Sequence, residues 1–272
     1  MGYNQADKIQ EHYDLGSPLY VQLWGTHIHH GYFEHGNESK EEAQEKLITL
    51  LIAHGRVKNG SRVLDVGCGV GGTALRLAKE MDCRVVGISI SPVQIQMANE
   101  AAVGVKNAPH FLVGDANDLQ IQGEFDVIWA VEMISHVRNR EGLFKNFSKL
   151  LSGGGRICIA AWLKDDCIIQ SDERKYIEPI ESGMLVDLPD FSEYKKYAKD
   201  NGLRFVYYED ISARVAKTWD ISAAYLKDRA LWRMARTHPK EFTSFVKSFH
   251  AIRTGFKAGA FRYGVMVLEK PQ

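Results

Sequence analysis

Apolar runs and amphipathic stretches alternate along most of the chain. Short apolar runs predict buried strands, and the stretches between them have the spacing of helices. Ser91 followed by Pro92 is typical of a helix start, where Gln94 would complete a capping box. The predicted strands are residues 63–66, 84–88, 110–113, 125–130, 156–162, 203–208 and 262–269, with helices at 73–81, from Pro92 and at 141–151. This alternation indicates an α/β fold with a mostly parallel, seven-stranded sheet and helices on both faces.

The N-terminal stretch of about residues 1–60 does not follow this pattern. It includes a helix that begins with a capping box of Ser39 and Glu42 and ends at Gly55. We expect this stretch to form a cap on a single domain.

Two insertions also interrupt the pattern, at about residues 164–201 and 212–259. Residues 219–236 carry apolar side chains at helical spacing, namely Trp219, Ala223, Leu226, Ala230 and Met234. Core packing is the simpler explanation of this stripe. The alternative, which we adopt as the expectation for both insertions, is a lid over an apolar substrate.

The charge balance limits the partners of the protein. Lys and Arg together number 34, as do Asp and Glu, so the formal net charge is zero. This argues against nucleic acid or an anionic membrane as a broad electrostatic partner. No apolar run approaches the ~20 residues that span a bilayer, and the polar start lacks a signal-peptide core. We expect a cytoplasmic protein with no integral membrane association, whose four cysteines, none in a CxxC pair, stay reduced.

The first strand runs directly into a glycine-rich turn. Asp65 lies near the strand end, and Gly67, Gly69 and Gly71 follow at every second position. Glycine permits positive φ and lets a ligand lie against bare backbone, and the next helix presents its N-terminus to a polar group. The G-x-G-x-G spacing differs from the G-x-G-x-x-G of dinucleotide sites. Because an acidic residue here can pair with an ammonium group, the pattern indicates a ligand with an amino-acid end and a nucleoside.

Residues 65–71 resemble the first motif of class I S-adenosylmethionine-dependent methyltransferases. Residues 87–94 are similar to the second motif of the γ-tocopherol, sterol and phosphoethanolamine subgroup. Residues 12–14 and 24–33 look like the N-terminal segment of the γ-tocopherol methyltransferase-like group, and residues 129–136 match its fourth-strand motif. The resemblance implies the Rossmann-like class I methyltransferase fold, with S-adenosyl-L-methionine as cofactor and S-adenosyl-L-homocysteine as product.

The resemblance also implies roles for several cofactor-binding residues. Tyr13 and Tyr32 would reach the cofactor from the N-terminal segment. Asp115 would accept a hydrogen bond from the adenine amino group, and the backbone of Ala116 would meet the ring. For Asp115, the alternative is a turn residue after a strand.

The ribose site departs from the common class I pattern. Ser89 stands where most of these enzymes have Asp or Glu. By resemblance, the tocopherol and sterol subgroup also has a hydroxyl residue at this place. Gln94 would share its task of holding the ribose hydroxyls, although the capping box alone would also explain this residue.

His136 and Glu132 are the candidate catalytic residues. The ordinary pKa of histidine, about 6.5, suits proton removal from an acceptor that carries a proton. Glu132 would contact the cofactor's amino group or the acceptor. The alternatives are a structural histidine and a helix-start acid. Ser135 is a departure, because related enzymes usually have Glu directly before the histidine.

Four histidines lie close together at His27, His29, His30 and His35. Neighbouring imidazoles can bind zinc. However, no cysteine or acidic residue nearby has the spacing of a metal site, and we expect no metal.

The predicted function is methyl transfer to a small lipophilic or aromatic acceptor. Relatives in this group methylate ring carbons or alkaloid nitrogens, which we favour, and O-methylation is possible. Tryptophans could line an aromatic pocket, at Trp24, Trp162, Trp219 and Trp232. The alternatives are a cyclopropane-synthase-like enzyme that uses the same cofactor on an alkene, and a non-catalytic nucleotide-binding domain.

Overall fold

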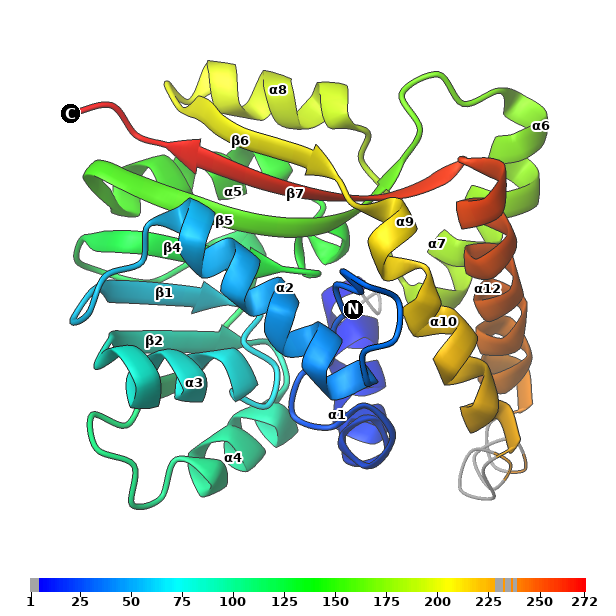
Figure 1. The fold of residues 1–272 in the computed structure, drawn as a ribbon, viewed down its shortest axis with the longest axis horizontal. Helices are drawn as coiled ribbons and strands as arrows, with labels where there is room; N and C mark the ends of the chain where they lie inside the picture. The colour runs from blue at the N-terminus through cyan, green and yellow to red at the C-terminus, as the bar shows by residue number, and fades with distance from the viewer. Residues whose placement is uncertain (1–4, 228–231, 233–235, 237–238) are drawn as a thin grey trace.

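A seven-stranded sheet with the strand order β3-β2-β1-β4-β5-β7-β6 forms the centre of the protein (Figure 1). The computed structural model describes residues 5–227, 232, 236 and 239–272. Strands β1 to β5 pair in parallel, and β7 is antiparallel to both of its neighbours. The strands are β1 (Arg62–Val66), β2 (Arg84–Ser89), β3 (His110–Val113), β4 (Phe125–Val131), β5 (Leu151–Lys164), β6 (Arg204–Asp210) and β7 (Phe261–Glu269). All seven predicted strands are confirmed, and so is the fold class.

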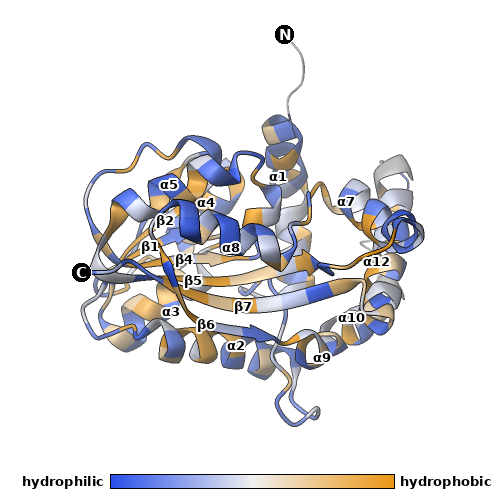
Figure 2. Cartoon of the chain, turned by 90° about the horizontal axis from the view of Figure 1, so that it is seen from above, coloured by the Kyte–Doolittle hydropathy of each residue, from blue (hydrophilic) through white to orange (hydrophobic). Residues whose placement is uncertain are grey.

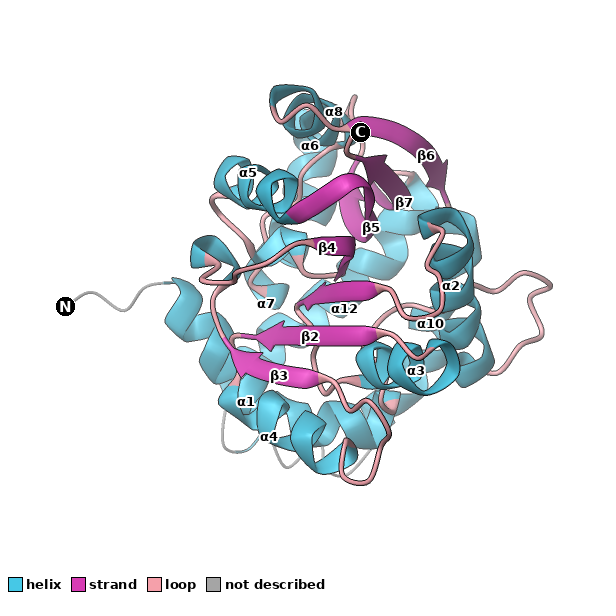
Figure 3. Ribbon diagram, turned by 90° about the vertical axis from the view of Figure 1, so that its left-hand side faces the viewer, coloured by secondary structure: helices cyan, strands magenta, loops and turns pink. Residues whose placement is uncertain are grey.

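Helices cover both faces of this sheet (Figure 3). One face carries α5 (Arg140–Leu150) and α8 (Phe191–Asp200), whose apolar side chains pack in one core cluster with the strands. The other carries α2 (Lys40–Gly55), α3 (Gly72–Met81) and α4 (Pro92–Ala101), which contribute to a second cluster. Figure 2 shows orange, apolar residues along much of the central sheet and both apolar and polar residues along the flanking helices. The predicted capping box of Ser39 and Glu42 at the start of α2 is confirmed.

Further helices stand beyond the carboxyl end of the parallel strands (Figure 1). They are α1 (Gln5–Trp24), α6 (Gln170–Asp172), the π-helical turn η3 (Glu173–Ile177), α7 (Glu178–Met184), α9 (Ser212–Val215), α10 (Lys217–Ser222), η4 (Ala223–Lys227) and α12 (Pro239–Ala258). Short 3-10 turns η1 (Ala116–Asp118) and η2 (Ile134–His136) follow β3 and β4. Among the described helices, none has both the length and the apolar character needed to cross a bilayer.

Helix α1 was not predicted from the sequence. Asp14 attaches it to α4, because its carboxylate accepts a hydrogen bond from the Ser91 hydroxyl at 2.5 Å. The inner face of α1 carries polar aromatic residues, and the helix contains Pro18, so it lacks the apolar stripe by which a helix is recognised.

The expected lid boundaries are too wide in their first part. Residues 191–200 form α8, and Tyr194 and Ala198 on this helix are buried in the core cluster of the sheet. An ordinary crossover helix therefore accounts for this segment. The apolar stripe predicted at residues 219–236 starts on α10, where Trp219 is buried, but its positions 230 and 234 lie outside the described residues.

Candidate active site

A cavity of about 360 Å³ opens at the carboxyl ends of β1, β2, β3 and β4. This is where ligands bind in open α/β sheets, and the volume falls in the usual range for small-molecule sites. Nine of the predicted site residues line it: Tyr13, Gly67, Gly69, Ser89, Gln94, Asp115, Ala116, Glu132 and His136. We call it the nucleoside cavity.

A second cavity of about 100 Å³ adjoins the first. Its wall is mostly aromatic, with contributions from α1, β5, α10 and α12, and we call it the aromatic cavity. Tyr13, Ile28, Glu132 and His136 line both cavities and therefore form their common wall. Three of the four predicted tryptophans line the aromatic cavity, namely Trp24, Trp162 and Trp219. Trp232 contacts Phe242 instead and is 54% exposed.

Asp65 lies in a third, smaller cavity of about 50 Å³ beside the glycine turn. Its side chain is buried, and one carboxylate oxygen, Oδ2, has no hydrogen-bond partner among the described residues. Burial raises the pKa of Asp65 to about 7, because it penalises the charged form of the carboxyl. Two imidazole nitrogens that line the same cavity, Nδ1 of His27 and Nε2 of His29, are also buried without a described partner. This small cavity thus gathers three acceptor atoms without a described partner, and the indole N–H of Trp129, which also lines it, is a buried donor without one.

The glycine turn adopts the backbone that its sequence predicts. Gly67, Gly69 and Gly71 all have positive φ, at 77°, 54° and 84°. At Gly72, a β-carbon would lie 2.4 Å from the carbonyl oxygen of Thr26. Because this position has no side chain, the N-terminal cap can lie directly across the start of α3.

We expect Gly67→Ala to destabilise the protein by ~2–3 kcal/mol, since the new β-carbon combines positive φ with a 2.6 Å approach to Cβ of Met133. Gly69→Ala is the matched control, because its β-carbon would meet open space and add only the ~1 kcal/mol backbone cost. Urea denaturation of both variants measures the difference. Equal losses would show that the contact with Met133 is relieved by relaxation.

Ser89 and Gln94 form a pair in the wall of the nucleoside cavity. The Ser89 hydroxyl donates to Oε1 of Gln94 at 2.7 Å, and both side chains are buried. Ser91 caps α4 as predicted, since its hydroxyl oxygen accepts from the Gln94 amide N–H. The Gln94 side chain, however, bonds to Ser89 and does not close the capping box. This part of the predicted cap is wrong, because the Ser89 hydroxyl bonds to the Gln94 side-chain oxygen, and the Ser91 backbone N–H donates to the Ser89 hydroxyl at 3.2 Å.

Asp115 lies where both the predicted adenine contact and the alternative, a turn residue after a strand, would place it. Its Oδ1 accepts hydrogen bonds from the backbone and side-chain amides of Asn117, which fixes the turn η1. The residue also lines the nucleoside cavity beside Ala116.

His136 joins three parts of the chain. Its Nδ1 lies 3.2 Å from the Leu185 carbonyl oxygen, so this nitrogen carries the proton and donates. Nε2 is then the acceptor, and the Tyr13 hydroxyl donates to it at 3.0 Å. Burial lowers the pKa of His136 to about 4, so the ring is neutral at pH 7. A neutral imidazole with an accepting Nε2 thus lies in the common wall of the two cavities.

Glu132 is held by four donors. Its Oε1 accepts from the backbone N–H of His30 at 2.7 Å, from Nδ1 of His30 at 2.9 Å and from the Tyr263 hydroxyl at 2.7 Å; its Oε2 accepts from the Trp162 indole at 3.0 Å. The Trp219 indole donates to Nε2 of His30. Burial alone would raise the pKa of Glu132, but electrostatic attraction to His30 and His29, together with the hydrogen bonds of His30, outweighs it and holds the pKa at about 2. A carboxylate with all these hydrogen bonds is a poor base, so this geometry does not support proton removal by Glu132. The positive backbone φ of 52° at Glu132 sets the direction of its side chain.

We expect Glu132→Gln to lower the free energy of unfolding by ~2–4 kcal/mol at pH 7, because an amide group must turn a donor toward an existing donor. The wild-type carboxylate has a depressed pKa in the folded state, so its contribution is complete above about pH 4.5 and disappears as the pH falls toward 2. Thermal unfolding between pH 3 and 7 tests this. Glu45→Gln, at a half-exposed carboxylate on α2, serves as control and should change stability by less than ~1 kcal/mol.

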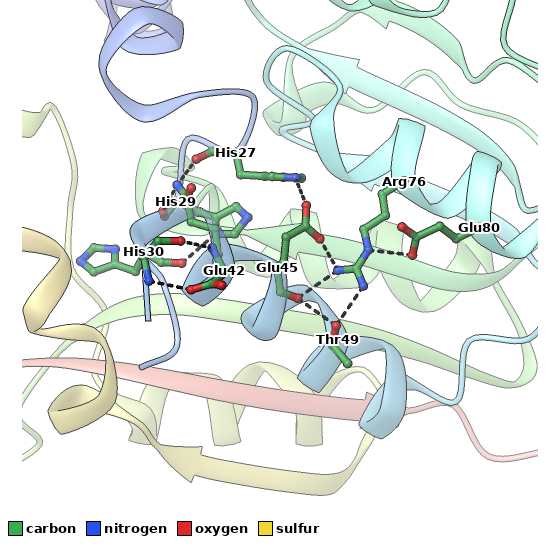
Figure 4. Close-up of polar contacts among 10 residues, drawn as sticks. His27, His29, His30, Glu42, Glu45, Thr49, Arg76 and Glu80 are labelled. Carbon is green, nitrogen blue, oxygen red and sulfur yellow. Dashed lines mark hydrogen bonds and ion pairs between the residues drawn. The ribbon is translucent and has the colours of Figure 1, made fainter. Parts of the chain in front are cut away.

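The segment with His27, His29 and His30 is held against α2 and α3 by hydrogen bonds and an ion pair (Figure 4). Nε2 of His27 bonds to Glu45 at 2.9 Å, and Arg76 on α3 forms an ion pair with the same carboxylate at 2.7 Å. The amide of Gln44 donates to the carbonyl oxygens of His27 and His29. Among the described residues, one group of side chains brings its ligand atoms close enough together for a metal ion. This group is Glu34, His35 and Glu38. Lys46 already lies 2.9 Å from both of these carboxylates, so their charge is compensated by an ammonium group.

The structure does not bring every predicted residue to the cavities. Tyr32 packs beside the core cluster on the α2 face, and its backbone N–H bonds to Ala43. Gly71 caps α3 and faces Phe111. Sequence reasoning missed His12 and Tyr20, which line the aromatic cavity. Both lie on helix α1, which carries no apolar stripe from which its inner face could be predicted.

Comparison with known proteins identifies the family. The family model described as mycolic acid cyclopropane synthetase matches residues 3–264. The chain is 31% identical to the 27-O-demethylrifamycin SV methyltransferase of Amycolatopsis mediterranei over 80% of its own length and 81% of the relative. It is 27% identical to the chloroplastic tocopherol O-methyltransferase of Arabidopsis thaliana, with 97% and 82% covered.

Among solved structures, a mycolic acid cyclopropane synthase in complex with SAH has the same fold, with a TM-score of 0.86 at 19% identity and 99% of each chain covered. The predicted enzyme class and cofactor are confirmed by these matches, as is the tocopherol methyltransferase-like subgroup. The chain belongs to the mycolic acid cyclopropane synthetase family and is a class I S-adenosylmethionine-dependent methyltransferase.

Proposed function

We propose that the enzyme methylates a lipophilic acceptor with a hydroxylated aromatic ring, which binds in the aromatic cavity beside the cofactor. The observation that carries this proposal is the common wall of the two cavities, where neutral His136 and the Tyr13 hydroxyl face both. A methyl acceptor that loses a proton during the reaction needs a base at this boundary, whereas an alkene needs no base for the transfer of the methyl group itself.

The residues present fit S-adenosylmethionine. The unpartnered oxygen of Asp65, with acceptor nitrogens of His27 and His29 in the same small cavity, suits an ammonium group with its N–H donors. The bare backbone of Gly67 and Gly69 leads from there into the nucleoside cavity.

At the other end of the site, the Ser89–Gln94 pair offers hydrogen bonds suited to ribose hydroxyls, and Asp115 and Ala116 lie where the purine would follow. When bound, S-adenosylmethionine supplies a methyl group on a positively charged sulfur. We assign no cofactor contact to Tyr32, in view of its place in the core.

His136 accepts the proton in this proposal, and Tyr13 stands between His136 and the substrate that receives the methyl group. The Tyr13 hydroxyl donates a hydrogen bond to Nε2 of His136. The Tyr13 proton can therefore move to Nε2, while the Tyr13 oxygen takes the proton of the substrate hydroxyl. The Leu185 carbonyl holds the other ring nitrogen and so fixes the tautomer. The negative charge of Glu132 favours the protonated form of His136. Glu132 acts as a positioning residue that holds the wall in place.

The aromatic cavity supports an uncharged acceptor. Its lining contains apolar and aromatic side chains, and no lysine or arginine is among the described lining residues. The indole N–H groups of Trp162 and Trp219 are directed to Glu132 and His30, so the rings present carbon surface to the cavity. Closure of the cap and of helices α7, α10 and α12 over this space would exclude water from the transfer.

Relatives agree with a phenolic acceptor. The Arabidopsis relative is named for O-methylation of tocopherol, a lipophilic phenol. The name of the matching family points instead to cyclopropane formation from an alkene, and this is the second candidate reaction.

The test is transfer of a labelled methyl group from S-adenosylmethionine to phenols, hydroquinones, tertiary amines and unsaturated lipids. We expect label in the phenols or hydroquinones. Label confined to amines or to cyclopropanated lipid would overturn the phenolic acceptor and leave the enzyme class intact.

A further inference from the structure

The aromatic cavity contains a second tyrosine–histidine pair that the proposed reaction does not use. The Tyr20 hydroxyl and Nε2 of His12 lie 2.8 Å apart, and both residues line the cavity. The pair therefore repeats the arrangement of Tyr13 and His136, which are 3.0 Å apart.

Both pairs lie on the same side of the cavity because α1 carries three of the four residues. The rings of His12 and Tyr13 meet edge to face with centroids 5.3 Å apart, and those of Tyr13 and Tyr20 are separated by 6.5 Å. Hydroxyl and imidazole groups thus occur at two neighbouring places along one wall. The 6.5 Å between the ring centroids of Tyr13 and Tyr20 is similar to the length of one aromatic ring with a substituent at each end.

Most other strong polar groups of this cavity are bonded to one another. Glu132 accepts four hydrogen bonds, and His30 uses both ring nitrogens toward Glu132 and Trp219. A tyrosine hydroxyl that bonds to one imidazole keeps a further hydrogen-bonding position. A buried polar pair in an apolar wall costs free energy, unless its remaining hydrogen-bonding capacity is used.

We propose that His12 and Tyr20 bind a second oxygen substituent of the acceptor, so that the enzyme selects a dihydroxylated ring over a monohydroxylated one. This inference rests on the proposed function, since it assumes a hydroxylated ring in the aromatic cavity. Tyr13 and His136 face the hydroxyl that loses its proton, and Tyr20 with His12 bonds to the other. Burial lowers the pKa of His12, so the pair offers a neutral hydrogen-bonding site that does not attract anions.

The experiment is calorimetric titration of the enzyme, loaded with S-adenosylhomocysteine, with hydroquinone and with phenol under anaerobic conditions. We expect the wild type to bind hydroquinone about tenfold more tightly than phenol, the effect of one hydrogen bond. Tyr20→Phe should remove this preference by weakening hydroquinone binding five- to tenfold while phenol binding changes less than about twofold. S-adenosylhomocysteine binding should not change, since neither Tyr20 nor His12 lines the nucleoside cavity.

Tyr207→Phe is the matched control. Tyr207 lies on β6, where its ring stacks on His54 with centroids 3.5 Å apart, and it lines neither cavity. An unchanged preference in Tyr20→Phe, or an equal loss for both probes, would overturn the assignment of the second oxygen site while the proposed function stands. Wild-type enzyme that binds neither probe would overturn the proposed function, and this inference with it.

Discussion

Asp65→Asn is expected to weaken binding of S-adenosylmethionine and S-adenosylhomocysteine by at least ~100-fold, because it removes a buried charge from an ammonium site. The wild-type carboxyl is buried with one oxygen unpartnered and has a pKa of about 7 without ligand. Affinity of the wild type should therefore fall as the pH decreases below about 7, whereas the variant should show no such dependence. Calorimetry between pH 5.5 and 8.5 measures both effects.

The same substitution should raise the stability of the ligand-free protein at high pH. The pKa of Asp65 is higher in the folded state, at about 7, than its ordinary value of 3.8, so the folded protein retains a proton that the unfolded chain releases. Stability of the wild type thus falls as the pH rises between these values, by at most ~4 kcal/mol. Asp65→Asn should remove this loss.

Asp126→Asn is the control for Asp65, because Asp126 accepts from the backbone of Arg62 at the opposite end of the strands. It should leave cofactor affinity unchanged within about twofold. If Asp65→Asn bound the cofactor as tightly as the wild type, the ammonium site would have to lie elsewhere.

His136→Ala is expected to lower turnover by ~100-fold or more on a phenol of ordinary acidity, since it removes the proton acceptor from the common wall. Affinity for S-adenosylhomocysteine should change only a few-fold. Tyr13→Phe should give a similar loss, because the proposed proton path passes through its hydroxyl. Single-turnover rates with a series of phenols of decreasing pKa provide the measurement.

The size of this loss should depend on the acceptor. A nitrophenol that is already ionised at pH 8 needs no base, so His136→Ala should affect its methylation much less. His110→Ala, at an exposed position on β3, is the control and should be indistinguishable from the wild type. An equal loss for all phenols, or a variant that no longer folds by circular dichroism, would assign His136 a structural role.

The sheet could be predicted from the sequence because its strands are continuous apolar runs. Residues 63–66 and 125–130 carry the signal of strands that are buried on both faces. Asp65 and the glycines after it were identifiable because their types are unusual at a strand end. These are local features, and the structure retains them.

The N-terminal helix α1 could not be predicted for a physical reason. Its inner face contacts a cavity and presents His12, Tyr13 and Tyr20 to it, so it carries no continuous apolar stripe. Apolar periodicity recognises helices that pack on a core, and it fails for a helix that forms the wall of a binding site.

The bonding of Glu132 also could not be read from the sequence. Its partners His30 and Tyr263 lie 102 and 131 residues away along the chain, and only the folded sheet brings them together. The sequence therefore indicated an acid at the site but not that four donors already hold it. Tyr32 shows the converse. Its place in the motif suggested a cofactor contact, whereas the residue packs on the α2 face and lines neither the nucleoside cavity nor the aromatic cavity.

The most direct test is a crystal structure of the protein with S-adenosylhomocysteine. We predict that the sulfur lies at the common wall formed by Tyr13, Ile28, Glu132 and His136 and faces the aromatic cavity, with the ammonium group at Asp65. A sulfur directed away from that cavity, or an ammonium group that does not contact Asp65, would contradict the account.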